Sequence, residues 1–273
     1  MQGLVQKYNL DGIRIDTIPE VPKTFWSTFT KAAGVFQFGE CFDGRADYVA
    51  GYQGAIDSML NYPLYFQLKN VFLYSHSMTE LETFFSQTLL KFPDPTVLGC
   101  FVDNHDNARF LSVNYDLTPF KAYIAFNLGV VGIPIIYYGS EQGFGGGNDP
   151  NNREPLWKNL NQNHELYLYV QKITNARKKV KWYSESQVQR YVDGSFYAFS
   201  RGKNLFLFTN QKSQITRTIT YHPFASGDII CNVFWYDSDC ITIASGGFNV
   251  YLNNGETKIY ILKGILGDQQ III

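Results

Sequence analysis

Up to about residue 180, short apolar runs alternate with segments whose apolar residues recur every three or four positions. Apolar runs of this length are typical of buried parallel strands, and the wider spacing is typical of helices. The runs expected to form strands are 12–16, 35–40, 97–104 and 134–141, with a weaker one near 55–60. The segments expected to form helices are 21–33, 62–73, 78–92, 119–130 and 164–180. This repeated strand-then-helix order predicts a parallel sheet or barrel.

From about residue 187 the pattern changes to period-two runs separated by turn residues. The runs expected to form strands are 189–192, 196–200, 204–209 and 257–262. Asp193-Gly194 and Asn253-Asn254-Gly255 supply turns of the kind that hairpins use. We therefore expect an α/β chain with three parts, namely a barrel-type part over 1–183, an antiparallel β domain over 184–264 and a tail over 265–273.

The composition argues against nucleic acid and membrane as binding partners of this chain. The formal net charge is −1 and only 17% of the residues are charged, so no nucleic-acid surface is predicted. No run approaches the roughly 20 apolar residues of a membrane helix. The first residues also lack the basic and apolar regions of a secretory signal.

The four cysteines are too few for a disulfide scaffold, and none are spaced as C-x-x-C. Cys41 and Cys100 lie in apolar runs, which is typical of buried free thiols. Cys231 and Cys240 are nine residues apart in the β-rich part. They are either a hairpin disulfide, if the chain is secreted, or two further thiols.

Acidic residues end three of the predicted strands, where α/β barrels keep their active sites. Arg14 and Asp16 are two apart on one strand and share a face, which places a cation beside Asp16 and keeps it ionised, as a nucleophile requires. Glu40 ends a nearly apolar strand, where burial favours the protonated form that a general acid needs. A third strand ends in Asn104-His105-Asp106. Each acid alone could be a helix cap or a solvated strand end, but the three together predict an active site.

The segments around these acids resemble the α-amylase family of retaining glycoside hydrolases, and within it the fungal-type α-amylases. Residues 12–17 are similar to the nucleophile strand, Gly39-Glu40 to the acid/base strand, and residues 101–107 to the third-carboxylate segment. Arg109-Phe110 belongs to the third-carboxylate segment as well. The resemblance extends through 60–63, 132–137, 146–150 and 152–154, and it continues less strongly into the β domain. It implies the carboxy-terminal part of a (β/α)8 TIM barrel, about strands 4 to 8, followed by an antiparallel β-sandwich domain.

The resemblance also implies a reaction, the endo-hydrolysis of α-1,4-glucosidic bonds in starch or glycogen with retention of the anomeric configuration. Asp16 would be the nucleophile, Glu40 the proton donor and Asp106 the stabiliser of the transition state. The substrate-binding positions that it implies are Arg14, His105, Asp149, Arg153 and Glu20. Taken without the family, Gly145-Gly146-Gly147 would predict only a mobile loop.

At Pro19-Glu20 the chain departs from the family, which usually has Lys-His there on the leaving-group side. The carboxylate of Glu20 should change substrate binding on that side. Pro19 is tolerated locally, because proline suits the first turn of a helix. The family implies calcium for a full-length member. The calcium of the family is bound in part by the backbone carbonyl of that histidine, and Glu20 could still offer this carbonyl. The side-chain calcium ligands have no counterpart in this sequence.

The sequence begins at what resembles the fourth barrel strand, so we expect an amylase fragment with at most five of eight strands, too few to close a barrel of that kind. Three functions stay open, namely hydrolysis, transfer to an acceptor, and a catalytically incompetent fragment or non-catalytic glycan-binding remnant. An α-glucan is the expected partner, with neither nucleic acid nor membrane. By resemblance, the complete gene product is expected to be a monomer that is secreted or kept in a digestive vacuole.

Overall fold

The computed structural model describes residues 1–266, which fall into two compact units. The bounds of the first unit are Met1–Gln67, Thr83–Phe101 and Gly132–Ile135, and the described residues of the second unit are Leu68–Glu82, Val102–Val131 and 136–266. Most of the tail expected at 265–273 lies outside the described residues. The proposed domain boundary near residue 183 stays a prediction. None of the described helices is long and apolar enough to cross a membrane.

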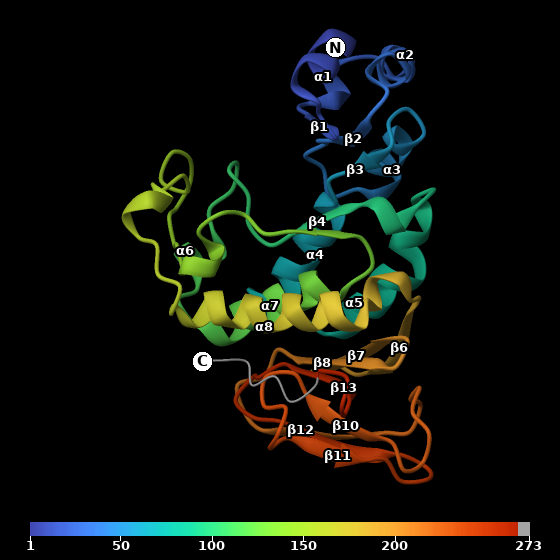
Figure 1. Cartoon of the computed structure of the whole chain (residues 1–273), viewed down its shortest axis with the longest axis vertical. Coiled ribbons are helices and arrows are strands. Elements are labelled where there is room, and N and C mark those ends of the chain that lie inside the picture. Colours follow the sequence, from blue (N-terminus) through green and yellow to red (C-terminus); the bar gives the residue numbers. More distant parts are fainter. Residues whose placement is uncertain (267–273) are drawn as a thin grey trace. The chain divides into compact units, whose positions relative to one another are not determined.

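Five parallel strands form the framework of the first unit, and Figure 1 shows the first three side by side. β1 (Gly12–Ile15), β2 (Phe36–Gly39) and β3 (Ser58–Met59) pair in that order, and β4 (Gly99–Phe101) pairs with β5 (Ile133–Ile135). A parallel bridge between Leu60 and Gly99 links the two ladders. The predicted parallel strands are therefore confirmed. The helices of this unit are α1 (Gln2–Tyr8), α2 (Lys23–Ala33), α3 (Ala46–Gln53) and the first part of α4 (Tyr62–Phe72).

Helix α2 fixes the segment that follows β1. Its Trp26 is buried, and the indole N–H donates to the carbonyl of Ile18 at 2.8 Å. The helix begins at Lys23, two residues later than expected, because Pro22 disfavours helical backbone at Val21, whose φ and ψ are −126° and 140°. It ends at Ala33 and is followed by Gly34, where a φ of 67° suits a residue without a Cβ.

The helix expected over 78–92 is broken. The structure has α5 (Thr79–Thr83), then a π-helical stretch over Phe84–Thr88 and a 3-10 turn over Leu89–Lys91. The apolar residues keep their three- and four-residue spacing, so the sequence pattern alone did not reveal the change of helix type.

Up to residue 266, the second unit contains α6 (Phe110–Val113), α7 (Leu117–Gly129) and α8 (Glu165–Val180), together with eight antiparallel strands, drawn in orange and red in Figure 1. The larger sheet has the strand order β11-β10-β13-β8-β7-β6, and β12 pairs with β9 in a second sheet. The strand bounds are β6 (Gln187–Val192), β7 (Phe196–Arg201), β8 (Asn204–Thr209), β9 (Ile215–Ile219), β10 (Ile229–Asn232), β11 (Cys240–Thr242), β12 (Phe248–Leu252) and β13 (Lys258–Leu262). β9 to β12 were not predicted, whereas the other four were.

Both faces of β7 are buried, because successive side chains of the strand point in opposite directions and each face packs against a different part of this unit. Phe196 and Ala198 belong to a core cluster that both antiparallel sheets share. The intervening Tyr197 and Phe199 face Phe126 of α7, with ring centroids 6.1 and 5.5 Å away. One face of β7 thus packs in the core of the antiparallel sheets, and the other packs against α7.

The cysteine alternatives are resolved. Cys231 and Cys240 are register partners on β10 and β11 and form a disulfide. Cys41 and Cys100 are buried thiols outside any disulfide, as expected.

Candidate active site

In the first unit, the carboxyl ends of β1 and β2 bring three predicted site residues together. Asp16 follows β1 and forms an ion pair with Arg14, the contact that strand periodicity predicts. Glu40 follows β2 and is only 5% exposed, whereas the Asp16 side chain is 67% exposed. The backbone N–H of Thr17 donates to Glu40 Oε2 at 3.0 Å. One acid is therefore buried and fixed, and the other is open and paired with a cation.

The backbone of Glu40 is fixed as firmly as its carboxylate. Its N–H donates to the carbonyl of Ile15 at 2.8 Å, and its carbonyl accepts from the N–H of Ile18 at 3.0 Å. Gly39 makes this approach possible, since a Cβ there would lie 2.1 Å from Ile56 Cδ1 and 2.9 Å from Ile18 Cδ1. A side chain at position 39 would require the Ile56 and Ile18 side chains, which pack beside Glu40, to move.

Glu20 lies in the same segment of the first unit. It ends a 3-10 turn over Ile18–Glu20 with Pro19 inside it, and its side chain is exposed. Lys23, at the start of α2, places its ammonium 4.5 Å from the ring centroid of Tyr52. The pKa of Tyr52 is raised to about 12, mainly by its hydrogen bond with Tyr48 and by burial. The negative charge of Glu20 makes a smaller contribution to this shift.

In the second unit, the other four predicted site residues form one cluster. His105 Nε2 lies 3.3 Å from Asp106 Oδ2, and an Arg153 guanidinium nitrogen lies 3.8 Å from Asp106 Oδ1. Arg153 Nε also lies 2.8 Å from Asp149 Oδ1. The structure thus places all eight candidates in two groups, each inside one unit. Their convergence at one barrel end stays a prediction.

Two asparagines that sequence reasoning did not single out as site residues shape this cluster. The fully buried Asn152 donates from Nδ2 to the carbonyls of His105 and Asn107 at 2.9 and 2.8 Å. Asn104 Oδ1 accepts from the N–H of Asp106 at 3.0 Å and from that of Asn107 at 2.9 Å. Asn side chains that hold a turn in this way are common, and Asn104 lies within the third-carboxylate motif.

Asp103 stabilises the turn over residues 104–107 through hydrogen bonds of its side chain. It is buried, and its carboxylate accepts from the N–H of Phe110 at 2.8 Å and from Ser140 Oγ at 2.9 Å. Burial raises the pKa of Asp103, and these hydrogen bonds offset part of that effect. Asp103 therefore anchors the turn and is shielded from substrate.

An ion pair between Arg109 and Glu154 holds the Gly-rich loop that sequence alone would predict to be mobile. Arg109 is fully buried, its Nε lies 2.8 Å from Glu154 Oε2, and it also donates to the carbonyl of Tyr138 at 2.9 Å. Glu154 Oε1 accepts from the N–H of Gly146 at 2.7 Å. A Cβ at Gly146 would lie 1.8 Å from the carbonyl oxygen of Asn151, so the loop needs glycine there.

Glu154→Gln is expected to lower the free energy of unfolding by about 3 kcal/mol, because it leaves the charge of the buried Arg109 unpaired. Glu165→Gln is the matched control, since it breaks only the exposed pair with Lys121 and should cost at most about 1 kcal/mol. Urea unfolding of both variants measures the difference. Equal losses would show that the buried pair has no special structural role.

Calcium fits this chain poorly. Within residues 1–266, no group of three or more His, Cys, Asp or Glu side chains is placed to hold a metal ion. No such group of side chains accompanies the backbone carbonyl of Glu20 in that range, and we assign no step of the reaction to a metal.

Comparison with known proteins agrees with the resemblance. A family profile described as "Alpha amylase, catalytic domain" matches residues 1–214. The chain is 37% identical over 274 residues to the Beta/alpha-amylase of Paenibacillus polymyxa, covering 95% of this chain and 22% of that protein. It is 36% identical to Alpha-amylase 2 of Schwanniomyces occidentalis, covering 98% of this chain and 55% of that protein.

The fold agrees as well. An α-amylase structure from Malbranchea cinnamomea superposes with a TM-score of 0.92 at 32% identity, covering 97% of this chain and 58% of that one. The chain thus spans about half the length of its fungal relatives. Its fold is that of an α-amylase catalytic domain with an antiparallel sheet. The chain belongs to the α-amylase catalytic-domain family of glycoside hydrolases.

Proposed function

We propose that this chain supplies the catalytic half of an endo-acting α-amylase, which hydrolyses α-1,4-glucosidic bonds of starch or glycogen with retention. Its five parallel strands would correspond to strands 4 to 8 of a (β/α)8 barrel, followed by a β-sandwich. The observation that carries the proposal is the Glu40 carboxylate held by the N–H of the residue after Asp16. This hydrogen bond links Glu40 to the residue next to Asp16, as retention requires, since its nucleophile and acid/base lie about 5–5.5 Å apart, whereas inversion needs a wider gap for water.

Each carboxylate has a role that suits its surroundings. Asp16, ionised beside Arg14, attacks the anomeric carbon while Glu40 protonates the departing glycosidic oxygen, so that a glycosyl ester forms and the leaving sugar departs neutral. Glu40, now a carboxylate, takes a proton from water, which attacks the same carbon and releases Asp16. Two displacements on one carbon restore the original configuration.

The second-unit cluster would bind the sugar during these steps. Asp106 would hold sugar hydroxyls most tightly in the distorted transition state, and His105, 3.3 Å from it, would bind hydroxyls of the sugar that is cleaved. Arg153 and Asp149 form one ion pair and would grip a sugar further from the cut. Glu20 would lie on the leaving-group side.

A non-catalytic glycan-binding role is the second candidate. The exposed carboxylate of Glu20, where the family usually has a histidine, favours it by altering the leaving-group side. Transfer to a sugar acceptor is a third possibility within the family, and analysis of the products for longer glucans would detect it.

Proton NMR of the first product distinguishes the mechanisms. A short maltooligosaccharide is mixed with this chain, or with the chain extended to the length of its relatives, and the α-anomer is expected to accumulate before mutarotation. An initial β-anomer would contradict retention, and the absence of any cleavage by the extended chain would favour the binding role.

The cellular setting follows from the same proposal. We infer an extracellular or digestive-vacuole enzyme that is a monomer when complete, with an α-glucan as its partner. The disulfide between Cys231 and Cys240 supports an oxidising compartment, since such bonds are rare in the cytosol.

A further inference from the structure

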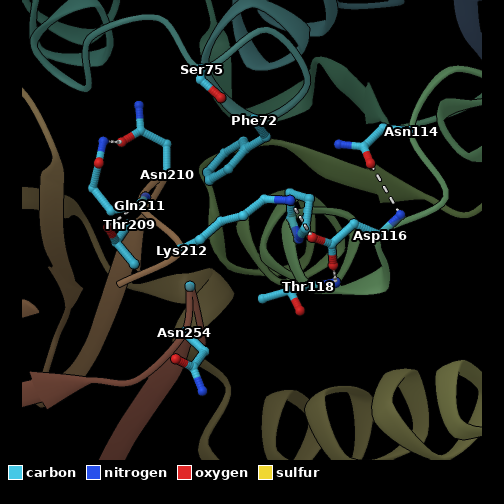
Figure 2. Close-up of a pocket in the computed structure, with 12 residues that line it drawn as sticks. Phe72, Ser75, Asn114, Asp116, Thr118, Thr209, Asn210, Gln211, Lys212 and Asn254 are labelled. Atoms are coloured by element: carbon cyan, nitrogen blue, oxygen red, sulfur yellow. Dashed lines mark hydrogen bonds and ion pairs between the residues drawn. The ribbon is translucent and has the colours of Figure 1, made fainter. Parts of the chain in front are cut away.

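The residue after Asp16 has an unusual backbone conformation. Thr17 has a φ of 44° and a ψ of 46°, in the left-handed region, which is an outlier for a β-branched residue. Two other residues with positive φ, Ser75 and Asn254, are exposed and line a pocket of the second unit that none of the candidate site residues lines (Figure 2). Thr17 differs from them in its place at the site, and its conformation persists only where the surrounding contacts enforce it.

This conformation turns two successive backbone N–H groups toward Glu40. In an extended strand, neighbouring N–H groups point to opposite sides, whereas a left-handed residue between them brings both to one side. The N–H of Thr17 donates to Glu40 Oε2 at 3.0 Å, and the N–H of Ile18 donates to the Glu40 carbonyl at 3.0 Å. The turn thus holds both the carboxylate and the backbone of Glu40.

A buried hydrogen bond from Trp26 holds this turn. Trp26 Nε1 donates to the carbonyl of Ile18 at 2.8 Å, and the same carbonyl accepts from the N–H of Val21 at 3.3 Å. Ile18 and Trp26 are both buried, and the indole packs edge-on against Phe29 of the same helix, with ring centroids 5.6 Å apart. The packing of α2 therefore places the indole N–H, which in turn fixes the residue directly after Thr17.

We propose that Trp26 is a positioning residue for Glu40. By binding the Ile18 carbonyl, it keeps Thr17 in the left-handed region and so keeps the N–H of Thr17 on the Glu40 carboxylate. A carboxyl group that gives a proton to a leaving oxygen, and later takes one from water, must be held in a precise place. The support of Glu40 is read from these hydrogen bonds, and its consequence for proton transfer rests on the proposed function.

Hydrogen–deuterium exchange tests this support without any need for activity. Trp26→Phe removes the hydrogen bond to Ile18, and the matched control Trp182→Phe removes the one that another buried indole makes to the carbonyl of Leu128 in the second unit, at 3.2 Å. In the 273-residue chain, Trp26→Phe is expected to speed exchange of the Thr17 and Ile18 amides about tenfold, the effect of losing about one hydrogen bond. Trp182→Phe should leave their exchange unchanged.

Kinetics distinguish positioning from a merely structural role. The leaving group of starch needs a proton, whereas that of an aryl α-maltoside with a good leaving group does not. In the chain extended to the length of its relatives, Trp26→Phe is expected to lower kcat/KM for starch about tenfold and kcat/KM for the aryl maltoside less than about twofold. Trp182→Phe should leave the ratio of the two values as it is in the wild type.

A second substitution tests whether the indole acts through the left-handed turn. Glycine adopts positive φ without strain and keeps the N–H, and the Thr17 side chain is exposed, so Thr17→Gly added to Trp26→Phe is expected to restore most of the kcat/KM for starch. Asn254→Gly makes the same kind of change at an exposed left-handed residue of the pocket in Figure 2. Added to Trp26→Phe, it is the matched control and should restore none.

The outcomes separate this inference from the proposed function. Equal exchange at Thr17 in the Trp26→Phe and Trp182→Phe chains, with both folded by circular dichroism, would overturn the positioning role. Equal losses of kcat/KM on the two substrates, or no rescue by Thr17→Gly, would overturn it as well. If Trp26→Phe speeds exchange as expected while the extended wild-type chain cleaves neither substrate, the support of Glu40 by Trp26 stands and the hydrolase proposal fails.

Discussion

Glu40→Gln is expected to reduce starch hydrolysis by about 10²- to 10⁴-fold, the usual contribution of a general acid. The amide keeps the shape of the carboxyl group but has no proton to donate to the leaving oxygen. Its Oε1 can still accept the N–H of Thr17, so the fold and the adsorption to starch should persist. Reducing-sugar release by the wild-type and variant chains, each extended to the length of its relatives, measures the effect.

Two comparisons test the assignment of Glu40. Glu80→Gln is the control, since it makes the same chemical change at an exposed helical residue paired with His76. An aryl α-maltoside with a good leaving group should still be attacked in the first step by the Glu40→Gln chain, because its departure needs no proton. Starch turnover above about a hundredth of wild type would mean that Glu40 is not the acid.

The parts of this site that could be predicted from sequence are those set by local periodicity. Arg14 and Asp16 share a face because a strand repeats every two residues, and they are paired in the structure. Glu40 is buried, as the almost wholly apolar strand before it predicts. Both inferences need only residues that are close in the sequence and the two-residue repeat of a strand.

The parts that were missed depend on partners far along the chain. Arg109 is fully buried because Glu154, 45 residues later, neutralises it, and no local pattern encodes that meeting. Asn152 binds the carbonyl of His105 across 47 residues. The strands β9 to β12 escaped prediction for a related reason, since residues 215–252 bury their apolar residues in a cluster that they share with β7 and β8.

The second large effect concerns the edges of the parallel strands. In the described residues, β1 pairs only with β2 and β5 only with β4, so each has one side without a ladder partner. Apolar side chains lie open beside these strands, with Phe36 at 36% and Ile133 at 38% exposure. Unpaired strand edges next to apolar surface are templates for association.

The purified 273-residue chain is therefore expected to associate into dimers or larger species in light scattering, and to bind an apolar dye. Ile133→Lys should reduce association, because an edge charge opposes strand pairing, without creating starch cleavage. Leu90→Lys, at an equally apolar and more exposed position outside the strands, is the control and should change association little.

Supplying the amino-terminal barrel segment of a full-length relative, in trans or by fusion, is expected to restore both solubility and starch cleavage, because it would pair both edges and complete the substrate cleft. Calcium alone should raise the melting temperature of the 273-residue chain little, since residues 1–266 present no cluster of metal-binding side chains to which it could bind. A monodisperse monomer that melts cooperatively and cleaves starch unaided would contradict this interpretation. Its five parallel strands would then have to protect their own edges by a contact other than the ladders found between β1 and β5.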